Sequence, residues 1–193
     1  MKSITIDRTK RLKEEPHTGH NRWHEDIPPV VEVEIGDRVI IDTFDAFDSQ
    51  GQPGMSSADF ARVDLGPVHP LTGPVFVRGA EPGDLLEVKL LAIEPDPFDA
   101  WGYTVEVPGF GFLRDHFPEP YIAHWHFTGG AAGVYAESPQ LPGVRIRYAP
   151  FPGTLGLAPS AELRARVIER EAALAARGGF VLGPEPADAV PAT

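Results

Sequence analysis

Hydrophobic and polar residues alternate in several short segments of the chain, and turns rich in proline and glycine separate these segments. Residues 31–35 read Val-Glu-Val-Glu-Ile, an alternation that predicts a strand whose three apolar side chains face inward. The longest strand is expected over residues 85–94, where apolar residues are most densely spaced. Further strands are expected around Ile4 and Ile6 and over residues 38–44, 101–107 and 144–148. This pattern favours a β structure with many turns.

One segment has the composition of an α-helix instead. Residues 161–177 consist mainly of alanine, leucine, glutamate and arginine; Ser160 can cap the N-terminus, and Gly178 follows as a stop signal. Leucine, valine and alanine side chains give this helix a modest apolar stripe. We therefore expect the helix to pack on a sheet.

Length and composition are those of a globular protein. With 193 residues the chain is long enough for one substantial domain, which we expect over residues 1–193. The 20 glycines and 21 prolines are spread without a repeat between apolar segments, which favours a turn-rich β fold over disorder. The net charge of −11 provides no basic surface for nucleic acid or anionic lipid, so we expect neither as a partner.

Missing residue types and motifs narrow the chemistry. There is no cysteine, which excludes disulfides, a thiol nucleophile and cysteine-ligated zinc. The sequence contains no Gly-x-Ser-x-Gly elbow and no phosphate-binding loop. It also contains no apolar signal-peptide region and no run of 18 apolar residues, so we expect a cytoplasmic protein without a membrane anchor.

An irregular segment over residues 16–29 is rich in ring nitrogens and aromatic surface. It holds His17, His20 and His24 together with Trp23. These side chains are suited to the wall of a binding site. The alternative is that Trp23 anchors the loop while the histidines face solvent.

Three aspartates, Asp42, Asp45 and Asp48, lie at the end of the strand expected over residues 38–44 and just after it. If that strand continues, Asp42 and Asp48 share one face and Asp45 lies on the other. The three are either solvated loop residues, or they supply a metal ligand or a general base.

Further histidines lie outside this region. His69 follows a turn in a stretch braced by proline and glycine, which we expect to hold its ring at the rim of a β-rich core. His124 and His126 have a spacing that is used in zinc sites of β proteins, although such a pair also arises by chance. Histidines, carboxylates and a metal-activated water are the parts that suit hydrolysis.

Five short segments occur in a fixed order and cover most of the chain. They are His20-Asn-Arg-Trp-His24 with Ile27-Pro-Pro29, Asp45-Ala-Phe-Asp48 with Gln52, His69-Pro-Leu-Thr-Gly-Pro-Val75 with Gly79-Ala-Glu-Pro-Gly-Asp84, Pro108-Gly-Phe-Gly-Phe-Leu113, and Pro150-Phe-Pro-Gly-Thr-Leu-Gly-Leu-Ala-Pro159. Together these segments resemble the acetamidase/formamidase family of amide hydrolases.

The resemblance implies an all-β fold, a jelly-roll-like β-sandwich, here with one C-terminal α-helix. It implies hydrolysis of a short aliphatic amide, such as formamide or acetamide, to a carboxylate and ammonia. It further implies an oligomer and a bound divalent metal, with zinc as one candidate. In this interpretation Asp45 and His24 have catalytic roles, and His20, Asp45 and His69 are metal ligands. A structural role for His69 is equally open.

The sequence also departs from the family. Later family segments of the types Gly-Gly-Asn-x-Asp, Gly-Asp-x-His-Ala and Gly-Asp-Gly-Glu are missing here. We therefore expect the N-terminal half of such an enzyme, either a separate subunit or a cleavage product, which acts with a complementary C-terminal half polypeptide. A sandwich divided in this way should expose an unusually apolar interface.

Two other classes of function remain open. The first is a non-catalytic β-sandwich subunit that binds a small molecule or has a structural role. The second is an independent ligand-binding jelly roll in which Trp23, Trp101 and Trp125 stack on sugars.

Overall fold

The computed structural model describes residues 1–95, 100–130, 133–183 and 187–192. The chain forms two compact units. The first contains Met1–Gln50, Asp64–Glu87 and Thr154–Thr193, and the second contains Gly51–Val63 and Val88–Gly153. The single domain predicted over residues 1–193 stays a prediction.

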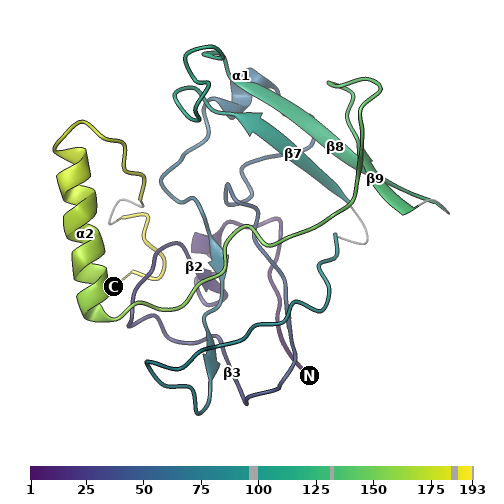
Figure 1. Cartoon of the computed structure of the whole chain (residues 1–193). Helices are drawn as coiled ribbons and strands as arrows, with labels where there is room; N and C mark the ends of the chain where they lie inside the picture. The colour runs from purple at the N-terminus through teal and green to yellow at the C-terminus, as the bar shows by residue number, and fades with distance from the viewer. Residues whose placement is uncertain (96–99, 131–132, 184–186, 193) are drawn as a thin grey trace. The chain divides into compact units, whose positions relative to one another are not determined.

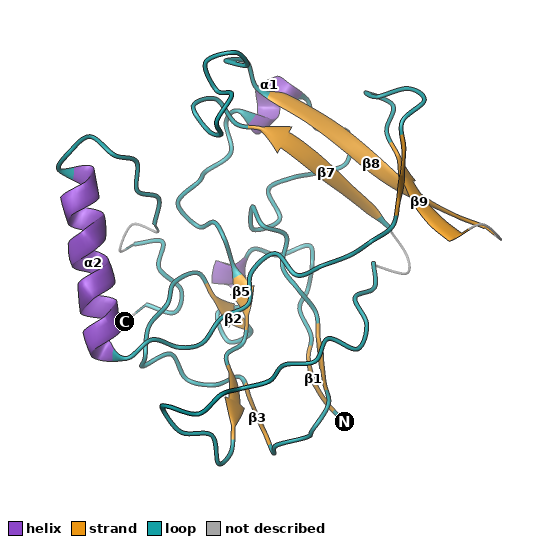
Figure 2. Ribbon diagram, in the orientation of Figure 1, coloured by secondary structure: helices purple, strands orange, loops and turns teal. Residues whose placement is uncertain are grey.

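Short paired strands form the framework of the first unit (Figures 1 and 2). β1 (Lys2–Ile4) pairs in parallel with β4 (Val39–Ile41), β2 (Gly19–His20) pairs antiparallel with β5 (Leu71–Thr72), and β3 (Val31–Val33) pairs in parallel with β6 (Val75–Val77). A short 3-10 helix, η1 (Leu12–Glu14), lies between β1 and β2 in the sequence. The core of this unit consists of apolar side chains from the strands and the loops between them: Ile4, Ile6, Leu12, Ile27, Val33, Val68 and Val190.

A buried carboxylate ties η1 to the turn that follows β4. The Asp48 side chain is 1% exposed and accepts hydrogen bonds from Arg11 Nε at 2.9 Å and from the Leu12 amide at 2.7 Å. Because the chain turns beyond β4, the expectation that Asp42 and Asp48 share one strand face is wrong. Asp48 is therefore a buried residue with a structural role, not a solvated loop aspartate.

The second unit is built on one four-stranded antiparallel sheet (Figure 2). Its strands are β7 (Trp101–Glu106), β8 (Tyr121–Gly130), β9 (Gly133–Glu137) and β10 (Arg145–Arg147), in the spatial order β10-β9-β8-β7. A single helical turn, α1 (Ser57–Phe60), contacts β8. Phe60 is 2% exposed and packs on the ring of Tyr103, and the core is completed by Ile122, Ala123 and Ala136.

The main helix is α2 (Ala161–Ala175), which belongs to the first unit (Figure 1). The Ser160 hydroxyl accepts a hydrogen bond from the Leu163 amide, and Gly178 takes a φ of +78°, which ends the helix as expected. The helix predicted over residues 161–177 is therefore confirmed, with a slightly earlier end. However, α2 buries none of its residues. The predicted packing of its apolar stripe on a sheet is wrong.

The predicted class, all-β with one C-terminal α-helix, is confirmed by this arrangement of strands and one main helix. Two local expectations are wrong. Residues 85–94 form no strand, although their pattern is the strongest in the sequence. Ile35 is 77% exposed because β3 ends at Val33 and a turn follows, in which the Asp37 amide donates to the Glu34 carbonyl at 3.1 Å.

Within the part of the chain that the structure describes, no helix has the length and apolar character needed to cross a membrane.

Replacement of Asp48 tests the role of the buried carboxylate. We expect Asp48→Ala to lower the free energy of unfolding by about 2–3 kcal/mol, because Arg11 and the Leu12 amide lose their acceptor in a buried place. Urea unfolding measures this change. The matched control is Asp115→Ala, whose side chain is 92% exposed and which should change the stability by less than about 0.5 kcal/mol. Equal effects of the two replacements would contradict the assignment.

Candidate active site

The loop that joins β2 to β3 carries the histidine-rich segment, and both of its ends are fixed. In the pairing of β2 with β5, His20 lies opposite Leu71. Gly19 is required there, because a Cβ atom at this position would lie 2.4 Å from the Leu71 carbonyl oxygen. At the other end Ile27 is 8% exposed and packs in the core. The side chains between them are therefore held by backbone pairing on one side and by burial on the other.

His20 is buried as a neutral ring with one free nitrogen. Its Nδ1 lies 2.7 Å from the Arg22 carbonyl oxygen, which can only accept, so Nδ1 carries the proton. Burial is the largest cause that lowers the pKa of His20, and the charge of Arg22 lowers it further. Nε2 is left unprotonated, with no hydrogen-bond partner among the described residues. This is the form in which a histidine binds a metal, with its other nitrogen fixed by a carbonyl.

The Trp23 ring contacts His20 on one side and the backbone at Gly156 on another. The Trp23 ring meets the His20 ring edge-on, with centroids 5.7 Å apart. A Cβ atom at Gly156 would lie 2.6 Å from Trp23 Cη2, so the chain around Gly156 passes close to the indole only because it lacks a side chain there. Trp23 therefore anchors the loop, although its side chain remains 41% exposed.

Asn21 and Arg22 fasten residues 188–191 to the same loop. The Asn21 side chain donates to the Asp188 carbonyl at 2.7 Å and accepts from the Val190 amide at 2.8 Å. The Asn21 amide also donates to the Val190 carbonyl at 3.1 Å, and Arg22 Nη2 donates to the Pro191 carbonyl. The segment Asp188–Pro191 thus forms one side of the histidine-rich loop.

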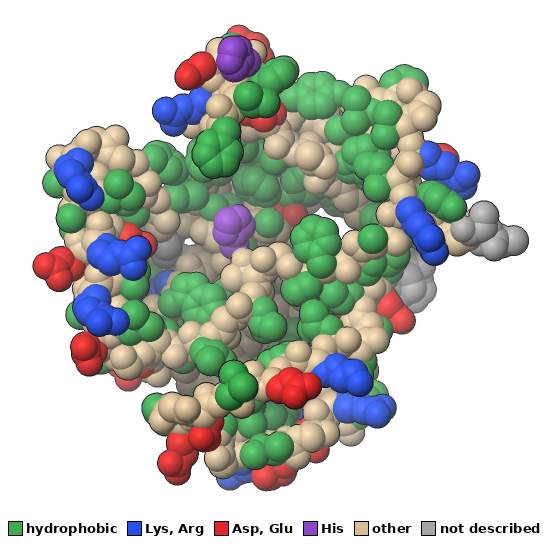
Figure 3. All heavy atoms as spheres, viewed as in Figure 1, with side chains coloured by type: hydrophobic (Ala, Val, Ile, Leu, Met, Phe, Trp, Pro, Cys, Tyr) green, Lys and Arg blue, Asp and Glu red, His purple; other side chains and the backbone are tan. Residues whose placement is uncertain are grey.

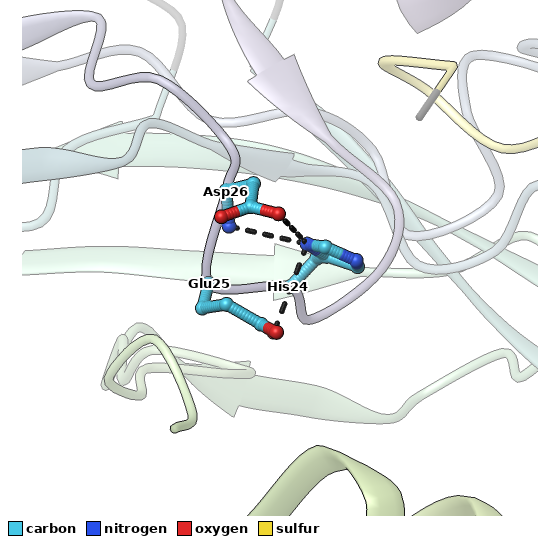
Figure 4. A group of neighbouring side chains, drawn as sticks. All are labelled: His24, Glu25 and Asp26. Atoms are coloured by element: carbon cyan, nitrogen blue, oxygen red, sulfur yellow. Dashed lines mark hydrogen bonds and ion pairs between the residues drawn. The ribbon is translucent and has the colours of Figure 1, made fainter. Parts of the chain in front are cut away.

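His24, Glu25 and Asp26 form a group of donor atoms that could hold a metal ion (Figure 4). His24 Nδ1 lies 3.7 Å from Glu25 Oε2 and 3.9 Å from Asp26 Oδ2. All three ligand atoms lie within 4.8 Å of one another.

Hydrogen bonds within the chain already engage most of these metal-ligand atoms. Both Glu25 carboxylate oxygens accept from Arg164 of α2, from Nε at 2.6 Å and from Nη2 at 2.8 Å. The Asp26 amide donates to His24 Nδ1 at 3.1 Å, which places the ring proton of a neutral His24 on Nε2. The group therefore serves first as the attachment of α2 to the loop, and it fits a metal only if these bonds are released.

Asp45 and His69 lie outside this group. Asp45 is half-buried at the head of a turn, where its Oδ2 accepts from the Phe47 amide at 3.0 Å. His69 is exposed next to the buried Val68. Among the described residues, His20, Asp45 and His69 do not form one cluster of metal-ligand atoms. Their roles as metal ligands, and those of Asp45 and His24 in catalysis, stay predictions.

The second unit contains the histidine pair that the sequence singled out. His124 is 5% exposed, and its Nε2 lies 2.8 Å from the Met55 carbonyl oxygen, while Nδ1 has no partner among the described residues. His126 is exposed. The described residues do not place a metal-ligand cluster at this pair.

Two features of the loop were not found from the sequence. Arg164 is far from Glu25 along the chain, and nothing in the helix pattern distinguishes it from the other arginines of α2. The hydrogen bonds of the Asn21 side chain to the backbone of residues 188–190 cannot be predicted from the hydrophobic pattern of the sequence. The string His-Asn-Arg-Trp-His was the only available signal.

Comparison with known proteins identifies the family. The acetamidase/formamidase family matches residues 5–193. The chain is 41% identical over 183 residues to an acetamidase of Mycolicibacterium smegmatis, an alignment that covers 90% of this chain. The chain belongs to the acetamidase/formamidase family. Another member, a formamidase of Methylophilus methylotrophus, is 39% identical over 167 residues, or 84% of this chain. The resemblance seen in the sequence is confirmed.

The similarity covers only part of each protein that this chain resembles. A gamma lactamase from Delftia acidovorans matches 100% of this chain with a TM-score of 0.91 and 35% identity, but the match covers 48% of the lactamase chain. The alignments cover 44% of the acetamidase and 40% of the formamidase. This acetamidase/formamidase chain therefore spans about half the length of the relatives that it matches.

Titration of Glu25 tests the attachment of α2. Arg164 lowers the pKa of Glu25 from 4.5 to about 2, mainly by the side-chain hydrogen bond. The ion pair therefore stabilises the fold fully above about pH 4.5, and the contribution is lost as the pH falls from there through about 2. Arg164→Gln should return the pKa toward 4.5, as measured by NMR of the side-chain carboxyl carbon.

The matched control is Arg166→Gln on the same helix, because Arg166 is exposed and makes no ion pair with Glu25. This replacement should leave the titration of Glu25 unchanged. A Glu25 carboxyl that titrates near 4.5 in the unaltered chain would show that Arg164 does not hold it.

Proposed function

We propose that this chain is part of an amidase that hydrolyses a short aliphatic amide to a carboxylate and ammonia. The observation that carries the proposal is the family match over residues 5–193, together with similarity to proteins named acetamidase and formamidase. The histidine-rich loop supports it, because a fixed neutral imidazole and nearby carboxylates are the groups that amide hydrolysis requires.

In the proposed reaction, water attacks the amide carbonyl and the leaving nitrogen is protonated. Asp45 accepts a proton from the attacking water or serves as a metal ligand. His24 is suited to donate a proton to the leaving ammonia, because its Nδ1 accepts the Asp26 amide and the proton of the neutral ring lies on Nε2. His20 presents an unprotonated Nε2 and Trp23 closes one side of its ring.

A divalent metal, with zinc as one candidate, is part of the proposal. When bound, such an ion lowers the pKa of water and polarises a carbonyl. His20 fits as a ligand because its ring is neutral and oriented through Nδ1. Asp45 and His69 are the further proposed ligands. Among the described residues these two do not cluster with His20, so the arrangement in this chain alone does not fit one ion held by all three.

We also propose that the half of the family fold outside these 193 residues completes the protein, as a second polypeptide or as more of the same one, and that the product is an oligomer. Hydrophobic side chains are spread widely over the face drawn in Figure 3. Three hydrophobic side chains, those of Phe112, Leu85 and Phe151, are almost fully exposed. Surface of this kind is typical of an obligate interface before assembly.

One observation favours the alternative of a non-catalytic subunit that binds a small molecule or has a structural role. Among the described residues, His20, Asp45 and His69 do not form one cluster of ligand atoms, and the group formed by His24, Glu25 and Asp26 is engaged with Arg164. A scaffold that had lost its chemistry would have these features. Cytoplasmic location and the absence of a nucleic-acid partner stay predictions from the sequence.

Ammonia release distinguishes the two functions. The sample is the completed assembly, meaning this chain together with the half of the family fold that it lacks, isolated through a tag on this chain. We expect ammonia from formamide, acetamide or propionamide, and we expect Asp45→Asn to lower the rate by about 10²–10⁴-fold because a base or ligand is lost. Asp115→Asn, at an exposed position, is the control. Near-normal turnover by Asp45→Asn would remove Asp45 from the mechanism, and release from no amide would favour the non-catalytic subunit.

Metal affinity tests His20 separately from turnover. In the completed assembly, His20→Ala should weaken zinc binding at least about 10-fold, measured by competition with a chromophoric chelator. His17→Ala is the matched control, because His17 is exposed in the adjoining segment. Unchanged zinc affinity after loss of His20 would mean that this imidazole is structural.

A further inference from the structure

The segment Val88–Ile93 of the second unit has the composition of a β-strand, but in the structure it does not form one. No residue between 85 and 95 is part of a strand or helix. Among the described residues, no backbone group of Val88–Ile93 has a backbone hydrogen-bond partner. The amides and carbonyls of this segment, apart from the Ile93 carbonyl, are thus open to another strand.

The side chains of this segment are apolar on one face and, apart from Lys89, on the other. In an extended chain Val88, Leu90 and Ala92 lie on one face, and Leu91 and Ile93 share the other with Lys89. Val88, Leu90 and Leu91 are 52%, 50% and 60% exposed. A run with five apolar residues out of six, spread over both faces, is typical of a strand that is largely covered on both sides, not of a solvated loop.

One end of the segment is held in place by the sheet of its own unit. The Tyr148 hydroxyl donates to the Ile93 carbonyl at 3.0 Å, and Tyr148 directly follows β10. The ring of Tyr148 in turn meets Phe127 of β8 edge-on, with centroids 5.4 Å apart. The segment is therefore presented at a fixed place beside the sheet instead of hanging free at both ends.

We propose that Val88–Ile93 is a docking strand, and that its partner is a strand from the half of the acetamidase/formamidase fold outside these 193 residues. The related gamma lactamase matches the whole of this chain with a TM-score of 0.91 and contains about as much chain again, so a fold of this kind exists with additional chain present. The inference rests on the completion by a second half proposed above, and it does not depend on amide hydrolysis.

A second copy of this chain is the rival partner, since exposed strands also pair with themselves. Six residues of self-pairing bury far less surface than the roughly 1,200 Å² that a stable interface needs. A second half of the fold can cover both faces of the segment as well as its backbone. The observations therefore favour the second half.

Hydrogen exchange of the backbone amides tests the docking strand. The probes are the unmatched remainders of the Delftia acidovorans gamma lactamase and of the Mycolicibacterium smegmatis acetamidase, each added to the 193-residue chain. In the chain alone the amides of Val88–Ile93 should exchange at the rate of unstructured peptide. On association they should slow at least 10-fold, while the amides of α2 are protected in both states.

A proline replacement tests the backbone contact itself. Leu90→Pro removes one amide donor and should weaken association at least 10-fold, without unfolding the chain, because that amide has no backbone partner in the chain alone. Leu155→Pro is the control, since Leu155 is 63% exposed in an irregular segment without this pattern, and it should change affinity less than 3-fold.

Three results would overturn the proposal. They are association without slowing of these amides, protection that appears only through dimerisation of this chain, and failure of both remainders to associate. Ammonia release measured on the same samples separates this proposal from the proposed function. If the amides of Val88–Ile93 are protected but no ammonia is released, the docking strand is supported and amide hydrolysis is not. If ammonia is released but these amides are not protected, amide hydrolysis is supported and the docking strand is not.

Discussion

The structure depends on the burial of hydrophobic side chains, and within these 193 residues only some of those side chains are buried. Leu12 and Phe60 are fully buried, each in the small core of its unit. Leu91 and Phe112, in contrast, are left largely in water. Because burial of apolar surface is the main favourable contribution to folding, these exposed side chains add little to the stability of the chain by itself.

Polar contacts make up for the small core at the candidate site. Asn21 holds residues 188–190, Glu25 holds α2 through Arg164, and His20 is fixed by a backbone carbonyl. Each of these bonds lies within the first unit. These bonds hold His20 and its neighbours in fixed positions, which is the preorganisation that a binding or catalytic site needs.

Local patterns predicted what local forces decide. The strand at 101–106 and helix α2 follow from alternation and capping, and both were found. Residues 85–94 have the strongest strand pattern, yet a strand needs a hydrogen-bonded partner, and these residues pair with no strand among the described residues. For the site, the sequence supplied His20, His24 and Asp45, but not the Glu25–Arg164 attachment, since contacts between distant positions carry no periodic signal.

The central claim is that this chain completes its fold and its site with the other half of the acetamidase/formamidase architecture. The mass of the native particle that contains it, measured by native mass spectrometry after isolation from the cells that make it, tests this claim most directly. The account predicts a particle in which every 21.0 kDa copy of this sequence is matched by a comparable mass of family sequence. A particle built from this 21.0 kDa sequence alone that releases ammonia from amides would contradict it.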